Sequence, residues 1–154
     1  MNETMRVLKA DIDAARQAIE HIYAMLDRYQ GIAWNEEQTI VVAYHLHNLY
    51  SAFEDVFQLV AEAFENQLSD RTQWHAQLLR RMALDIEGVR PRLLGSEASD
   101  CLDELRRFRH VFRSAYAVSL DQKRLALVWD KARRLQKIYR DDLDRFVSYL
   151  AQLD

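Results

Sequence analysis

The sequence predicts an all-α protein, an antiparallel up-and-down bundle of about five helices. Its 154 residues include only three glycines and one proline, so the residues typical of turns between β-strands are scarce. Apolar side chains recur at alternating steps of three and four, which places them on one face of a helix. A chain of this length buries roughly 68–70% of its surface around one core. We therefore expect a single domain over residues 1–154.

Two long helices are predicted in the N-terminal part of the chain. The first runs from about Thr4 to Tyr29 and is followed by a break at Gly31. Asn35, with two glutamates directly behind it, is typical of an N-cap and opens a second helix to about Asn66. The apolar stripes of these helices are Leu8, Ile12, Ala15, Ile19, Ile22 and Leu26, then Val42, Leu46, Leu49, Phe53, Val56, Val60 and Phe64.

A third helix is predicted between two polar breaks. Ser69-Asp70 resembles a capping sequence, and the helix is expected to continue to about Glu87, where Gly88 and Pro91 end it. Its inward-facing residues are expected to be Trp74, Leu78, Met82 and Ile86.

Two more helices complete the predicted bundle. Ser96 starts the fourth, which continues toward Leu120, and Asp121 caps a last helix to about Leu153. The expected core residues are Leu102, Leu105, Phe108, Phe112 and Ala115, then Leu125, Val128, Leu135, Ile138, Phe146 and Leu150. Short connections favour antiparallel neighbours. The long stripes of the first two helices fit either a homodimer interface or a larger monomer core.

Charge and composition narrow the class of protein. Residues 1–70 hold 4 basic and 12 acidic side chains, whereas residues 71–154 hold 17 and 12. Such a protein does not coat nucleic acid as a polycation, but it can bind RNA at a focused patch. A single cysteine, Cys101, is compatible with a reducing cytoplasm, where we expect the protein. No signal peptide or membrane segment is recognisable.

The fourth helix contains the most informative sequence. Four arginines, Arg106, Arg107, Arg109 and Arg113, occur with no acidic residue between Leu105 and Leu120. At about 100° per residue, Arg109, Arg113 and Tyr116 share one face. Arginine offers phosphate a permanent, bidentate donor pair, so this face is a candidate RNA-binding surface formed by Arg106, Arg109 and Arg113.

The segment LDELRRFRHVFRSAYAVSL, with WHAQLLRRM and GVRP before it, resembles the signature region of HepT-like proteins of the HEPN superfamily. These are small helical ribonuclease toxins that pair in bacteria with a nucleotidyltransferase antitoxin. Their motif is Arg, four residues, His, one residue, Tyr. On this chain the motif selects Arg109, Ser114 in place of the His, and Tyr116. The resemblance implies a metal-independent endoribonuclease without a cofactor, with its site usually completed across a homodimer.

The resemblance also assigns roles to these residues. Arg109 would bind and polarise the phosphate, and Tyr116 would be the hydroxyl to which the nucleotidyltransferase (MNT) antitoxin attaches AMP. The added charge would block a phosphate-binding cleft. Ser114 cannot carry protons near neutral pH as an imidazole can. We therefore expect impaired cleavage, whether the serine is natural or introduced, unless His110 acts from one turn earlier.

Other patterns compete with this site. A literal copy of the motif, Arg16, His21 and Tyr23, lies in an acidic segment of the first helix and is expected to be a helix surface with a half-buried tyrosine. His45 and His47 are two apart on a helix, so they cannot face one metal together. His75 is expected to serve in packing or capping. No metal site is predicted.

The function expected from the sequence is the toxin component of a HEPN/MNT toxin–antitoxin pair, with impaired ribonuclease activity. One alternative is a non-catalytic helical module that binds RNA or a protein with the same arginine face. A second is a plain interaction bundle, which would lack salt-sensitive RNA affinity.

Overall fold

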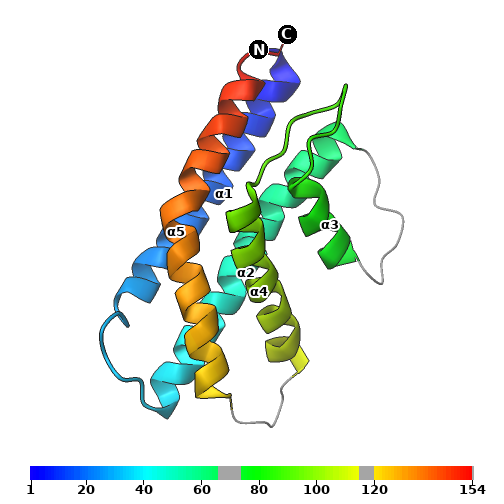
Figure 1. Ribbon diagram of the computed structural model, residues 1–154. Coiled ribbons are helices and arrows are strands. Elements are labelled where there is room, and N and C mark those ends of the chain that lie inside the picture. The colour runs from blue at the N-terminus through cyan, green and yellow to red at the C-terminus, as the bar shows by residue number, and fades with distance from the viewer. Residues whose placement is uncertain (66–73, 115–119, 154) are drawn as a thin grey trace.

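The computed structural model describes residues 1–65, 74–114 and 120–153, and of Ser114 the backbone alone. These described residues contain five helices, as predicted: α1 (Glu3–Asp27), α2 (Glu36–Phe64), α3 (Trp74–Met82), α4 (Ser96–Ser114) and α5 (Gln122–Leu150) (Figure 1). The all-α fold class is confirmed. The predicted stretch before Trp74 and the expected end of the fourth helix beyond Ser114 lie outside the described residues.

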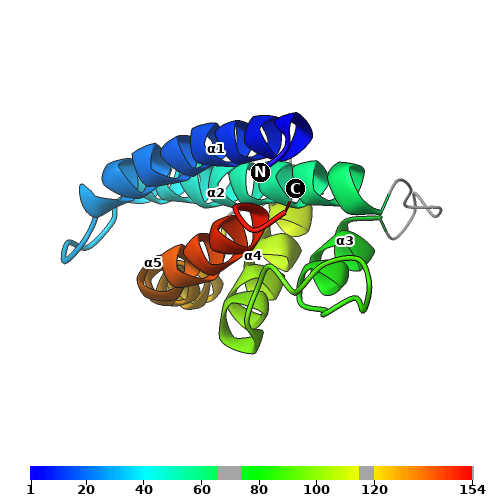
Figure 2. The same cartoon turned by 90° about the horizontal axis from the view of Figure 1, so that it is seen from above.

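The helices are arranged in two layers (Figure 2). Helices α1 and α2 lie together on one side, while α5, α4 and α3 follow one another across the other side. The chain ends, at α1 and α5, lie close together. Helix α2 contacts all four other helices, and α4 contacts α2, α3 and α5. The central position of α2 therefore gives α4 a long helical surface to pack against.

Local sequence signals define the helix ends. The Asn35 side chain accepts from the Gln38 backbone amide, and the Gln38 side chain accepts from the Asn35 amide, which forms a capping box. Asp121 caps α5 by accepting from the amides of Lys123 and Arg124. Gly31, with φ of 75°, permits the left-handed turn after α1.

The third helix is shorter than predicted, because it ends at Met82 and not near Glu87. The Met82 carbonyl accepts the backbone amides of Leu93 and Leu94 at 2.8 and 3.0 Å, so the chain folds back at this point. Ile86, expected in the helical core, instead forms an isolated bridge with Arg90.

The buried side chain of Arg90 holds this turn. Its guanidinium donates to the carbonyls of Arg81, Leu84 and Pro91, and it pairs with Glu65 at the end of α2. A buried cation that satisfies several carbonyl groups can fix irregular backbone. This role could not be inferred from the sequence pattern, because apolar periodicity does not report on buried charges.

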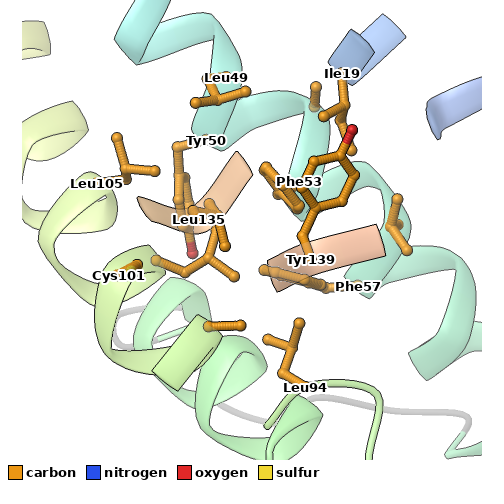
Figure 3. Close-up of a cluster of buried hydrophobic side chains, with 14 of the residues drawn as sticks. Ile19, Leu49, Tyr50, Phe53, Phe57, Leu94, Cys101, Leu105, Leu135 and Tyr139 are labelled. Atoms are coloured by element: carbon orange, nitrogen blue, oxygen red, sulfur yellow. The ribbon is translucent and has the colours of Figure 1, made fainter. Parts of the chain in front are cut away.

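One hydrophobic core contains residues from all five helices. Figure 3 shows Tyr50, Phe53 and Phe57 of α2 among Leu105 of α4 and Tyr139 of α5. The rings of Phe53 and Tyr139 meet edge to face at 5.3 Å between centroids, a favourable aromatic arrangement. This shared core fixes α4 against α2 along the face that carries the candidate site.

Candidate phosphate-binding site between α2 and α4

The four arginines of α4 divide into two pairs. Arg106 donates from Nε and Nη2 to one oxygen of Asp103, at 3.0 and 2.9 Å. Arg107 pairs with the other oxygen of Asp103 at 2.9 Å and with Glu104 at 3.4 Å. Side chains three or four residues apart on a helix are neighbours. The positive charge of this first pair is therefore compensated within α4 itself.

The second pair, Arg109 and Arg113, has different surroundings. The Nε of Arg109 donates to the Ser51 hydroxyl of α2 at 2.9 Å. Ser51 in turn donates to the backbone carbonyl of His47 at 3.3 Å. Among the residues that the structure describes, neither Arg109 nor Arg113 forms an ion pair with a carboxylate. Their charge is thus concentrated on the C-terminal half of α4.

His47 of α2 lies beside these two arginines. Its imidazole lies 5.3 Å from the Phe112 ring, centroid to centroid, and its Nδ1 is 3.3 Å from the Asn48 side-chain oxygen. Partial burial lowers the pKa of His47, the contact with Asn48 partly offsets this, and the charges of Arg109 and Arg113 lower it further. The structure therefore places a neutral imidazole next to two cations.

The sequence pattern does not associate His47 with the arginine helix. Its spacing from His45 excludes only a metal site shared by the two histidines. Their different orientations are confirmed, because His45 is buried and its ring lies 6.5 Å from that of Tyr29 and 5.9 Å from that of Tyr44. One signal was available: His47 and Ser51 are four residues apart and therefore share a face of α2.

The remaining predicted site residues are only partly described. His110 is exposed on α4, directly after Arg109. Ser114 is the last residue of α4, and its side chain lies outside the described part of the chain, as does Tyr116. Arg106 belongs to the compensated pair, so its predicted contact with RNA would compete with Asp103. These assignments stay predictions.

His75 of α3 also lies against α2, at Glu54. The Nδ1 of His75, on α3, lies 2.7 Å from the Oε2 of Glu54, a carboxylate that is only 4% exposed. The ring also meets Trp74 edge to face at 4.8 Å. The contact with Glu54 joins α3 to the central helix, which fits the predicted packing role of His75.

The literal copy of the motif in α1 has a structural role. Arg16 pairs with Asp144 of α5 at 2.6 Å. The Tyr23 hydroxyl donates to the Ala132 carbonyl at 2.8 Å, and its ring stacks on Tyr139 at 5.8 Å between centroids. Burial raises the pKa of this phenol. Tyr23 is 2% exposed, so the expectation of a half-buried ring was wrong, and Arg16 and Tyr23 both join α1 to α5.

No helix in the described part of the chain is long and apolar enough to span a bilayer.

Comparison with known proteins identifies the family. A family model described as HepT-like protein matches residues 41–150, more than two thirds of the chain. No curated protein matches the sequence, and no solved structure does. The matched segment includes both sides of the site, from His47 and Ser51 of α2 to Arg109 and Arg113 of α4. The chain is a member of the HepT-like family of the HEPN superfamily.

Proposed function

We propose that this protein is the toxin component of a bacterial HEPN/MNT toxin–antitoxin pair and that it binds RNA phosphate with the C-terminal half of α4. The observation that carries the proposal is the hydrogen bond that Arg109 Nε donates to the Ser51 hydroxyl at 2.9 Å. It fixes the plane of a guanidinium whose charge is not compensated by a carboxylate of the described residues. A fixed arginine of this kind is suited to bind phosphate oxygens.

Arg113 adds a second positive charge one turn further along α4, where the residue is exposed. Two cations at helical spacing can face adjacent oxygens of one phosphate or two successive phosphates of a strand. They would also stabilise the negative charge that develops during phosphodiester cleavage. Contacts to phosphate carry no base preference, so the site by itself specifies an RNA backbone and not a sequence.

Cleavage at this site is expected to be weak. The family places a histidine at the position of Ser114, and a serine hydroxyl does not take up or release protons near pH 7 as an imidazole does. AMP attached to Tyr116 by a nucleotidyltransferase antitoxin would add bulk and negative charge near Arg109 and switch off RNA binding by repulsion. A homodimer would bring two such faces into one assembly.

The experiment that tests the proposal compares the wild-type chain with its Ser114→His variant. Both are incubated with a labelled RNA hairpin in EDTA, and cleavage and binding are measured side by side. We expect both proteins to bind the RNA in a salt-sensitive way and the variant to cleave at least about 100-fold faster, the usual contribution of a general acid or base. Folded proteins that neither bind nor cleave the RNA would contradict the proposal.

A non-catalytic RNA-binding module is the second candidate, and Ser114 is the observation that favours it. In that case the Ser114→His variant would bind RNA as the wild type does, without cleaving it. Replacement of Arg109 does not distinguish the two candidates, because both require the arginine for binding.

A further inference from the structure

We propose that His47 is the general base of this site and that it supplies from α2 the imidazole that α4 lacks at position 114. The inference rests on the proposed function, since it needs RNA phosphate at Arg109. It adds a catalytic residue outside the three motif positions and predicts slow cleavage by the wild-type chain.

The position of His47 follows from how α2 packs on α4. Ser51 lies one turn after His47, accepts the Nε proton of Arg109 and donates to the His47 carbonyl. On the α4 side, the Phe112 ring lies against the imidazole, 5.3 Å between centroids. The guanidinium of Arg109 thus contacts α2 one turn after His47, and the imidazole of His47 contacts Phe112 of α4, so both groups lie at one junction of the two helices. The imidazole is half-buried and therefore still partly accessible.

The protonation state of His47 suits a base. Burial and the charges of Arg109 and Arg113 lower its pKa, only partly offset by Asn48, so the ring is neutral at pH 7. When Nδ1 carries the proton, it donates to the Asn48 side-chain oxygen. The lone pair then lies on Nε2, where it can accept a proton from a substrate hydroxyl.

The reaction needs only RNA and water. His47 Nε2 takes the proton of a 2′-hydroxyl, and the 2′-oxygen forms a bond to phosphorus while the bond from phosphorus to the 5′-oxygen breaks. The leaving 5′-oxygen takes a proton from a water molecule, and the resulting hydroxide is neutralised by the proton on His47. Arg109 and Arg113 face the charge on the non-bridging oxygens. The products carry a 2′,3′-cyclic phosphate and a 5′-hydroxyl.

Two of the other histidines are held elsewhere. His45 is buried beside tyrosine rings, and His75 is bonded to Glu54. His21 is exposed on α1 and belongs to the segment in which Arg16 is paired with Asp144. His21 is therefore a suitable control position, because it tests the loss of an imidazole outside the α2–α4 junction.

The experiment compares the wild-type chain with His47→Gln and His21→Gln. Cleavage of a labelled RNA hairpin in EDTA is followed through the 2′,3′-cyclic phosphate end, and binding is measured by fluorescence anisotropy. We expect His47→Gln to cleave at least about 100-fold more slowly, with RNA affinity within about twofold of wild type, and His21→Gln to behave as wild type. The wild-type rate should rise with pH to a plateau, and this rise should be absent in His47→Gln.

The inference is overturned if His47→Gln cleaves at the wild-type rate, or if the wild-type chain binds RNA through Arg109 without cleaving it. In the second case the proposed phosphate site stands. If the wild-type chain does not bind RNA and the Ser114→His variant does not cleave it, the proposed function is overturned as well. If His47→Gln does not fold, inorganic phosphate is titrated into the wild-type chain. A saturable shift of the His47 imidazole NMR signals, absent for His21, supports the inference, and its absence refutes it.

Discussion

Helices α1 and α4 each carry an arginine seven residues before a tyrosine, and the two arginines have opposite surroundings. Arg16 is paired with Asp144, and its side chain is 19% exposed. Arg109 is bonded to the neutral hydroxyl of Ser51. The first arginine joins two helices through an ion pair, whereas the second has no carboxylate partner among the described residues. The charge of the neighbouring residues, and not the spacing of the motif, distinguishes the two segments.

The largest effect expected from this comparison concerns Tyr23. Replacement by Ala removes a buried ring that stacks on Tyr139 and bonds to the Ala132 carbonyl. We expect the free energy of unfolding to fall by about 3–5 kcal/mol, as for other buried aromatic residues replaced by Ala. Urea denaturation followed by circular dichroism measures the change. If the free energy of unfolding fell by less than about 1 kcal/mol, Tyr23 would not have the structural role of joining α1 to α5.

The second prediction compares the two arginines directly in RNA binding. Arg109→Ala should weaken binding by about 2 kcal/mol, or roughly 30-fold, the scale of a charge-assisted hydrogen bond. It should also reduce the slope of log affinity against log salt by about 0.7 for each single-strand phosphate that the variant no longer neutralises. Arg16→Ala is the matched control and should bind RNA within about twofold of wild type. Anisotropy titrations at several salt concentrations measure both quantities, and equally weakened binding in the two variants would remove the distinction between α1 and α4.

The extent to which the sequence predicted the molecule differs between the fold and the site. The helices, their caps at Asn35 and Asp121 and most core positions follow from periodicity and capping chemistry, which act within a few residues along the chain. The predicted end of α3 was wrong because it depends on Arg90, whose carbonyl partners and Glu65 are brought together only by the fold. Local patterns carry little information about such long-range polar contacts.

The same limit applies to the site. The sequence selected Arg109 and Arg113 through the absence of acidic residues after Leu105 and through family resemblance. It did not reveal that Arg106 and Arg107 are compensated while Arg109 is held by α2. Neither did it indicate His47, which lies 62 positions before Arg109 and comes near the arginine helix only because α2 packs along α4, where its ring contacts Phe112. A helical face can be predicted from one segment, but the residue opposite it cannot.

The smallest expected effect is a change in the pKa of His47, which tests how closely α2 packs on α4 at this residue. Because the charge of Arg113 opposes protonation of His47, Arg113→Ala should raise the pKa of His47, while Arg109 and partial burial continue to lower it. Arg16→Ala, which alters the paired arginine on α1, should leave the His47 titration unchanged. An NMR titration of the imidazole signals between pH 4 and pH 8, a window chosen around the reference pKa of about 6.5, measures each value. An upward shift in Arg113→Ala alone would place the imidazole within the field of the α4 cations, as proton abstraction next to a bound phosphate requires. If the pKa of His47 were the same in all three proteins, the charge of Arg113 would not act on the imidazole. Arg109 would then remain as the phosphate-binding group of a site without a base.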